Sequence, residues 1–346
     1  MDYLFDKVTA PNADFELLAR QKQAQLTKPQ GSLGMLEEIA VRLSAMQQTQ
    51  TPKIEKVWVS VFAADHGIAA ENVSAFPQAV SVEMVKNFAA GGAAVNVLSR
   101  HVHADFEVID VGLLQTLTLK NIVTDKSAQG TANFSHQAAM TVPQLNHALT
   151  AGKNAVKRAQ AHQAQLFIGG EMGIANTSSA SAIACALLKQ SPNALTGAGT
   201  GLNSEAIAHK AQVIEHALKL HQQQLDNPLK VLQFLGGFEI AALVGAYIFA
   251  AQQQLPVLVD GFIATAAALV AITINREVQD WLIYAHQSEE KGHQQILQAL
   301  NAKPLLNLAM RLGEASGAVV AVPLLQMACK LHNEMATFKQ AHITTE

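Results

Sequence analysis

The chain has 346 residues, 49% of them hydrophobic and 15% charged, and a formal net charge of −3. This much apolar material supports a sizeable buried core and excludes a disordered chain, and the absence of excess positive charge argues against nucleic acid as a partner. Its two cysteines, Cys185 and Cys329, lie in apolar helical patterns, so we expect a reducing compartment and no disulfide framework. The N-terminus lacks a charged-then-apolar signal pattern, which predicts a cytoplasmic protein.

Short apolar runs alternate with helical patterns through the middle of the chain. The runs cover residues 57–67, 106–112, 165–173, 231–237 and 255–261, and helical patterns cover 80–100, 150–163, 204–224 and 238–253. Continuous apolar runs of this length are typical of strands that are covered on both faces. The alternation predicts an α/β fold with a doubly wound, Rossmann-like parallel sheet.

The two ends of the chain show helical patterns without strands. Residues 14–49 and 290–340 carry apolar positions at helical spacing, such as Leu36, Ile39 and Leu43. We therefore predict a smaller helical domain formed from residues 1–50 and 290–346, beside an α/β nucleotide-binding domain at 51–289.

The apolar segment at residues 255–274 is long enough to resemble a membrane span. Pro256, Asp260 and Gly261 interrupt it, however. Its first part predicts a buried strand that ends in an acid, and the remainder predicts a buried helix. We expect no membrane association.

Polar side chains follow several of the predicted strands. Asp65 and His66 come after the first, Glu171 after the third and Asp260 after the fifth. In an open parallel sheet, ligands bind beyond the carboxyl ends of the strands, so we expect these groups to converge. The Asp65–His66 pair suits metal binding or acid–base chemistry, but a hydrogen-bonded turn is the commoner explanation. No HxxxH or CxxC spacing occurs, so we predict no metal site.

Two glycine-rich turns precede predicted helices, "GGEMGIANTSSASAI" at 169–183 and "TGAGTGL" at 196–202. Backbone N–H groups at a helix start can hold a phosphate, although Asn176 or Thr177 could equally be an ordinary helix cap. Two such turns favour a phosphorylated ligand. The second is only loosely similar to GxGxxG and lacks the acid that binds a dinucleotide ribose, which disfavours a nicotinamide-dependent dehydrogenase.

Glu314 lies in "RLGEASGAVVAVPLL", residues 311–325, among small and apolar neighbours. A carboxylate in such surroundings loses hydration and its proton affinity rises, which suits a general base. The alternative is a buried structural acid. Residues 74–78, "SAFPQ", form a proline-fixed loop with an aromatic ring, and such a loop can wall a pocket for a flat ligand.

The motifs together carry a resemblance to a known family. They are "KPQGSLGMLEEIA", "ADHGIAAENVSAFPQ", "GGAAVNVL", "GGEMGIANT", "TGAGTGL", "VDGF", "SEEKGH" and "RLGEASGA", in this order. The chain resembles the nicotinate-nucleotide–dimethylbenzimidazole phosphoribosyltransferases of cobalamin synthesis, from about residue 20 to about residue 338.

The resemblance implies a reaction in which nicotinate mononucleotide donates its 5-phosphoribosyl group to 5,6-dimethylbenzimidazole. The products would be α-ribazole 5′-phosphate and nicotinate, with inversion at the anomeric carbon. The family's base corresponds to Glu314, which would take the ring proton of the benzimidazole. The resemblance also implies a doubly wound domain with a small helical domain, a homodimer, and no cofactor or metal for the chemistry.

The resemblance further assigns two groups of binding residues. The nucleotide and its phosphate would contact Glu171, Gly173, Asn176, Thr196, Gly197, Gly199, Thr200, Lys210 and Ser288. The benzimidazole would contact Ser74, Phe76, Pro77, Gln78, Met84, Met172 and Leu312. Two alternatives stay open: a related phosphoribosyltransferase for another azole or a purine base, and a non-catalytic nucleotide-binding or regulatory protein.

Overall fold

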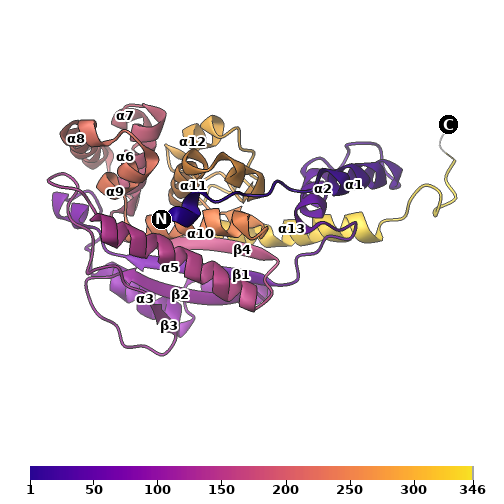
Figure 1. The fold of residues 1–346 in the computed structure, drawn as a ribbon, viewed down its shortest axis with the longest axis horizontal. Helices are drawn as coiled ribbons and strands as arrows, with labels where there is room; N and C mark the ends of the chain where they lie inside the picture. Colours follow the sequence, from indigo (N-terminus) through magenta and orange to yellow (C-terminus); the bar gives the residue numbers. More distant parts are fainter. Residues whose placement is uncertain (345–346) are drawn as a thin grey trace.

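A computed structural model describes residues 1–344 of the chain (Figure 1). Its centre is a six-stranded sheet in the order β3-β2-β1-β4-β5-β6, in which every neighbouring pair is parallel. The strands are β1 (Val57–Ala64), β2 (Asp105–Gly112), β3 (Ile122–Thr124), β4 (Leu166–Met172), β5 (Val257–Val259) and β6 (Leu282–Tyr284). The strand order reverses between β1 and β4, so the predicted doubly wound parallel sheet is confirmed.

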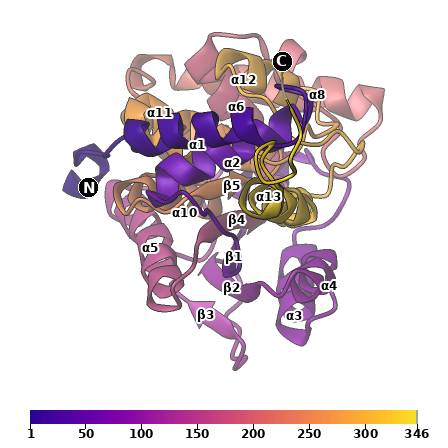
Figure 2. The ribbon, with the colours of Figure 1, turned by 90° about the vertical axis from the view of Figure 1, so that its right-hand side faces the viewer.

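Helices cover both faces of this sheet. They are α1 (Ala13–Gln25), α2 (Met35–Gln47), α3 (Val80–Ala90), α4 (Ala94–His101), α5 (Val142–Ala161), α6 (Asn176–Leu188), α7 (Pro192–Leu195), α8 (Ser204–Leu220), α9 (Pro228–Leu235), α10 (Phe238–Gln252), α11 (Phe262–Ile274), α12 (His293–Ala299) and α13 (Ser316–Glu334). Figure 2 shows α5, α10 and α11 on one side of the strands, and α3, α4 and α13 on the other. The sheet is therefore the middle layer of three.

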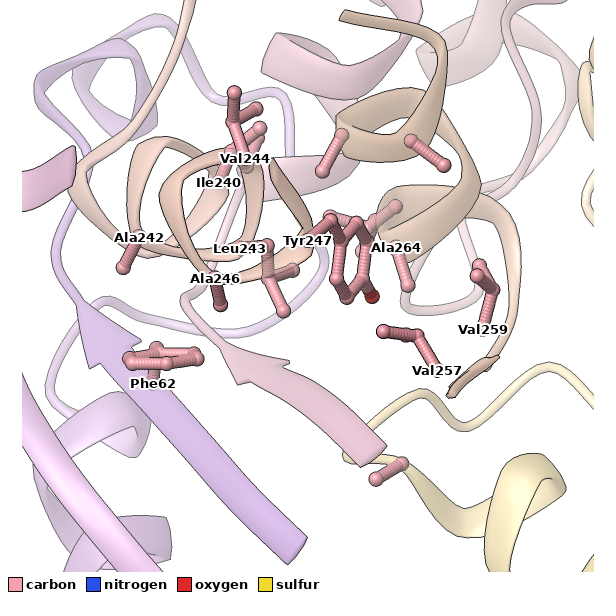
Figure 3. Close-up of a cluster of buried hydrophobic side chains, with 14 of the residues drawn as sticks. Phe62, Ile240, Ala242, Leu243, Val244, Ala246, Tyr247, Val257, Val259 and Ala264 are labelled. Atoms are coloured by element: carbon pink, nitrogen blue, oxygen red, sulfur yellow. The ribbon is translucent and has the colours of Figure 1, made fainter. Parts of the chain in front are cut away.

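The core is densest where α10 lies on β1 and β4. Every residue from Phe238 to Ala251 is buried, and Phe62, Leu243 and Tyr247 fill the space between helix and sheet (Figure 3). On its other side α10 touches α5 through glycines. A side chain at Gly152 would collide with the backbone of Ala242, so the two helix backbones are in direct contact. This packing fixes the sheet whose strand ends form the site.

One predicted strand is wrong: most of residues 231–237 belong to helix α9, not to a strand. Asn227 caps this helix by accepting the backbone N–H of Lys230, and Pro228 occupies its first turn. Asparagine followed by proline is a strong helix-start signal. The apolar residues that suggested a strand, among them Val231 and Leu235, are the buried face of this helix.

Other elements differ in extent. The predicted helix at 80–100 is two helices, α3 and α4, separated by Gly91, which has a φ of 80°. The three-residue strands β3 and β6 were not predicted. Residues 14–49 form two helices, α1 and α2, with a turn between them that contains Gly31 and Gly34 at positive φ.

The terminal helices α1, α2 and α13 pack together and extend beyond the sheet (Figure 1). The two chain ends also meet directly, since Thr27 donates its backbone N–H to Ala336 and Gln23 hydrogen-bonds His332. By contrast α12, which follows residue 290, lies against α11 and α6 of the α/β part. The division of the chain into two domains stays a prediction.

No helix within residues 1–344 has the length and hydrophobicity needed to cross a membrane. The apolar segment at 255–274 consists of β5, a short turn and α11, and nearly all of it is buried. Cys185 and Cys329 are both free and buried.

Candidate active site

A cavity of about 450 Å³ opens beyond the carboxyl ends of β4, β5 and β6, the edge at which a parallel sheet binds its ligands. Among the predicted site residues, its wall contains Phe76, Met84, Glu171, Met172, Gly173, Asn176, Gly199, Thr200, Ser288, Leu312 and Glu314. The structure thus brings together residues that lie more than 200 positions apart in the sequence. The remaining predicted residues lie next to this cavity.

The predicted site residues outside the cavity wall lie in two regions. Ser74, Pro77 and Gln78 line a second hollow of about 380 Å³ that shares Phe76 with the main cavity. Thr196 and Lys210 are buried behind the wall, and a side chain at Gly197 would collide with the carboxylate of Glu290.

Glu314 is held in an unusual backbone conformation. Gly313, Glu314 and Ala315 have φ values of 81°, 62° and 69°, a left-handed run that directly precedes α13. Left-handed φ at a residue other than glycine is unfavourable and persists only where the surroundings enforce it. Here β4 contributes, because a Cβ at Gly170 would lie 2.7 Å from the backbone N of Ala315. The turn therefore rests on the strand backbone and places Glu314 at the cavity.

The surroundings of Glu314 make its carboxylate a proton acceptor at neutral pH. Its side chain is 5% exposed, and burial, together with the negative charge of Asp260, raises its pKa to about 7. A base is most effective when its pKa is near the working pH. Low hydration was expected from the sequence, but the contribution of a second carboxylate was not.

Glu171 is the penultimate residue of β4 and is also buried. It accepts a hydrogen bond from the side chain of Asn176, the first residue of α6. Burial, and then the negative charges of Glu239, Asp260 and Glu314, raise its pKa well above the ordinary value. The helix cap position is taken by Ala175, so the alternative that Asn176 or Thr177 caps α6 is wrong.

A cationic group lies at the glycine-rich end of the cavity. Lys210 is fully buried, and its Nζ donates a hydrogen bond of 2.6 Å to Oγ1 of Thr177. Burial lowers the pKa of Lys210 to about 8, although the negative charge of Glu290 acts in the opposite direction. A Cβ at Gly199 would lie 2.8 Å from Oγ1 of Thr177 and 3.2 Å from this Nζ, so the glycine lets the turn approach the buried lysine closely. Ammonium, hydroxyl and glycine backbone together are typical of an anion site.

Ser288, another residue of the cavity wall, is held in place by a buried histidine. The backbone N–H of Ser288 donates to Nδ1 of His293, while Nε2 of the same ring faces Oγ1 of Thr265 at 2.9 Å. Burial, assisted by the nearby His286, lowers the pKa of His293 to about 3, so the ring is neutral. A neutral ring that accepts at Nδ1 carries its proton on Nε2, and this fixes the position of Ser288.

The other end of the cavity is apolar. Its side chains are Phe76, Val80, Met84, Met172, Ile174, Ile263 and Leu312, whereas Phe262 lies beside the ring of His293. Phe76 and Leu312 are each about half exposed, at 52% and 55%. The loop that carries Phe76 is tied to the glycine-rich turn, because Oγ1 of Thr200 accepts the backbone N–H of Ala75 and lies 3.1 Å from Oγ of Ser74.

The cavity thus has a glycine-rich turn beside a buried lysine, a group of apolar side chains, and a carboxylate of raised pKa in its wall. The phosphoribosyltransferase family model matches residues 8–343 of this chain. The chain belongs to the phosphoribosyltransferase family.

Several relatives of this phosphoribosyltransferase carry a more specific name. A protein from Xanthomonas oryzae pv. oryzae is 55% identical over 344 residues, 99% of each chain, and is named nicotinate-nucleotide–dimethylbenzimidazole phosphoribosyltransferase. A protein of the same name from Azotobacter vinelandii is 53% identical and covers 94% of this chain and 93% of its own. The crystal structure of CobT from Thermus thermophilus superimposes with a TM-score of 0.92 at 40% identity, over 96% of this chain and 100% of that one. The predicted family is confirmed.

The Asp65–His66 pair of this phosphoribosyltransferase lies outside the cavity wall. His66 and Glu239 are both fully buried, and Nε2 of the histidine lies 2.6 Å from Oε1 of the glutamate. Asp65 accepts the backbone N–H of Leu114. Within the described part of the chain, no three histidine, cysteine or carboxylate side chains are grouped as metal ligands. The hydrogen bonds of both side chains agree with the interpretation of this pair as part of a hydrogen-bonded turn.

Some residues of the phosphoribosyltransferase site were not predicted. Thr177, His286, Glu290 and Arg311 all line the cavity, and Arg311 donates to the backbone oxygen of Gly199. Three of them lie in motifs that carried the resemblance, "GGEMGIANT", "SEEKGH" and "RLGEASGA". Position within a motif was therefore the available signal, but only the structure shows which side chains reach the cavity.

Proposed function

We propose that this phosphoribosyltransferase transfers the 5-phosphoribosyl group of nicotinate mononucleotide to 5,6-dimethylbenzimidazole, giving α-ribazole 5′-phosphate and nicotinate. The observation that supports the proposal most is Glu314, a buried carboxylate with a pKa of about 7 in the wall of a cavity that also contains apolar side chains and a glycine-rich turn. The names of the Xanthomonas and Azotobacter relatives support the choice of substrates. The reaction belongs to cobalamin nucleotide-loop assembly.

In the proposed reaction, one ring nitrogen of the benzimidazole attacks the anomeric carbon from the face opposite to nicotinate. The glycosidic bond breaks, its electron pair returns to the pyridinium ring, and nicotinate leaves. The newly bonded benzimidazole is then cationic and still carries its other ring proton. Glu314 takes that proton, so the product is neutral at the base and has the α configuration.

Nucleotide binding in this proposal depends on Lys210, Thr177 and the glycine-rich turn at 196–202. Glu171, Asn176 and Ser288 border the same region, and the apolar end with Phe76, Met84, Met172 and Leu312 would receive the flat ring. Ser74, Pro77 and Gln78 would act through the loop beside it.

Lys210→Ala should raise the KM for nicotinate mononucleotide by about 10–100-fold, because hydrogen bonds to charged groups contribute about 1.5–3 kcal/mol each. The KM for the base should change much less. The matched control is Lys219→Ala on the same helix, since the side chain of Lys219 is 73% exposed and pairs with Glu215. Nicotinate riboside, which lacks the phosphate, should be a poor donor. Equal use of riboside and mononucleotide would refute the phosphate site.

Flat bases should react in the order of the apolar area they bury. Each methylene-sized contact in such a pocket contributes about 1–3 kcal/mol to discrimination, so imidazole should be far poorer than 5,6-dimethylbenzimidazole. Competition between the two bases for limiting nucleotide measures the ratio of their kcat/KM values. If imidazole reacts as efficiently, the apolar end has been assigned wrongly.

Two alternatives are separated by the same kind of assay. A phosphoribosyltransferase for another azole or a purine would give higher kcat/KM with that base than with dimethylbenzimidazole. A non-catalytic nucleotide-binding protein would bind nicotinate mononucleotide and release no nicotinate. The position of Glu314 in the cavity wall, together with its raised pKa, favours catalysis over a purely structural role.

We further infer that the protein is a cytoplasmic homodimer. The packed terminal helices expose large apolar side chains, namely Leu17, Leu18, Met35 and Met327. Surfaces of this kind are often covered by a second subunit. Sedimentation velocity tests the inference, which a monomer at micromolar concentration would contradict. The two free buried cysteines are compatible with a reducing compartment.

A further inference from the structure

Asp260 lies just behind the cavity wall and has no role in the reaction described so far. It follows β5, is 2% exposed, and its Oδ1 accepts the backbone N–H of Ala318 at 2.7 Å. Its carboxylate also interacts with the backbone N–H groups of Gly261 and Ala315. Both Ala315 and Ala318 belong to the start of α13, so a residue of the sheet binds the end of a helix that is distant in sequence.

The start of α13 needs such a partner. A helix begins with N–H groups that have no acceptor within the helix, and a side chain at the cap position usually satisfies one of them. In α13 the cap position is Ala315, which has no side-chain acceptor. A carboxylate at this end is further stabilised by the helix dipole. Asp260 therefore supplies from β5 the cap that the local sequence lacks.

The same contact bears on Glu314, which immediately precedes the cap residue. Glu314 and Ala315 both have left-handed φ values, a conformation that the surroundings must enforce. The backbone of Gly170 on β4 packs closely against the turn, and Asp260 accepts a hydrogen bond from the first helical turn that follows it. Without Asp260, the helix start would lose its hydrogen bonds to that carboxylate, and the strained turn would lose one of its restraints.

We propose that Asp260 is a positioning residue that caps α13 across the sheet and thereby holds the Glu314 carboxylate at the cavity. The proposal deepens the proposed function, because it explains how the base of that reaction is kept in place. Asp260 does not line the cavity itself and acts only through Glu314.

Asp260 also determines the electrostatic surroundings of that base. Each neighbouring strand end contributes a titratable group: Glu171 on β4, Asp260 on β5 and His286 after β6, whose Nε2 lies 3.7 Å from Oδ1 of Asp260. Glu290 and Arg311 line the same cavity. The negative charge of Asp260 raises the pKa of Glu314. Removing that charge while retaining the cap should therefore lower the pKa of Glu314.

Asp260→Asn removes the charge and keeps one acceptor oxygen for the backbone N–H of Ala318, the 2.7 Å hydrogen bond of the cap. The pKa of Glu314 can be followed by ¹³C NMR of glutamate side-chain carboxyls, assigned by the loss of one signal in Glu314→Gln. We expect it to fall by about one unit in Asp260→Asn, the lower end of the range for a neighbouring charge. Asp260→Ala removes the cap as well, and should lower kcat by about 10–100-fold with little change in the nucleotide KM.

The matched control is Asp110→Asn at the end of β2. Asp110 is also buried and accepts two backbone N–H groups, of Gly112 and Leu113, but it lies outside the cavity wall. It should leave the pKa of Glu314 unchanged. The proposal is overturned if Asp260→Asn leaves that pKa within about 0.2 units of wild type, a small fraction of the shift expected from a neighbouring charge, or if folded Asp260→Ala retains wild-type kcat. Because the titration needs no substrate, it decides the role of Asp260 even if the wild type fails to form the proposed product.

Discussion

Glu314→Gln is expected to reduce turnover by about 10²–10⁴-fold, the usual effect of losing a general base. Glutamine keeps the size of the side chain but cannot accept the ring proton of the attacking base. In the wild type, whose Glu314 pKa is about 7, turnover should fall as the pH drops below that value and the carboxylate becomes protonated. The variant should lose this dependence, because its amide does not titrate there.

Nucleotide binding and turnover should be measured on the same preparations, by calorimetry and by nicotinate release. The control is Glu334→Gln at the far end of α13, where the side chain is 64% exposed and pairs with Lys330. It should behave as wild type. A Glu314→Gln variant that turns over within a few-fold of wild type would show that the proton leaves by another route.

The pH dependence of the free energy of unfolding provides a second test of Glu314. The folded pKa of Glu314 is raised above its ordinary value of 4.5, so the folded state binds the proton more tightly than the unfolded state does. Stability therefore decreases as the pH rises from about 4.5 to about 7. Glu314→Gln should remove this loss and be at least as stable as wild type at mildly alkaline pH, which separates impaired catalysis from impaired folding.

His66→Leu is expected to lower the free energy of unfolding by about 3–5 kcal/mol, the range for leaving a buried charged group without its partner. His66 and Glu239 are both 0% exposed and lie 2.6 Å apart, between the end of β1 and the start of α10. Loss of the histidine leaves the Glu239 carboxylate buried without its partner. Burial of an uncompensated charge is the source of the effect.

Urea unfolding at neutral pH measures this change. The double variant His66→Leu/Glu239→Leu should recover most of the loss, because replacing both partners of a buried pair by apolar residues is often neutral or stabilising. The exposed pair Lys86–Glu83 serves as the control, and Lys86→Leu should cost at most about 1 kcal/mol. A loss below about 1 kcal/mol in His66→Leu, as small as for a surface pair, would show that the pair contributes little to stability.

The sheet was predictable from sequence wherever a strand is long and covered on both faces. All residues of β1 and β4 are buried, which produces the continuous apolar runs seen in the sequence. The edge strands β3 and β6 contain three residues each and have polar residues close on both sides, whereas β5, equally short, lies within a longer apolar run. The failure at 231–237 has a different origin, since the apolar face of a short buried helix cannot be distinguished from a strand by composition alone.

The site was predictable at the level of motifs and less so at the level of contacts. Glu314 was indicated by its apolar surroundings, and the glycine-rich turns indicated an anion site. The roles of Lys210 and Asp260 depend on distant partners, Thr177 and the start of α13. Such contacts across the fold leave no local pattern in the sequence, and the neutral state of His293 likewise follows only from its burial.

The most direct test of the account is product analysis of the purified protein incubated with nicotinate mononucleotide and 5,6-dimethylbenzimidazole. We predict equimolar release of nicotinate and α-ribazole 5′-phosphate, with the α configuration established by NMR of the anomeric proton, and no such product with Glu314→Gln on the same time scale. Formation of the β anomer, or nicotinate release without a ribosylated base, would contradict the proposed transfer.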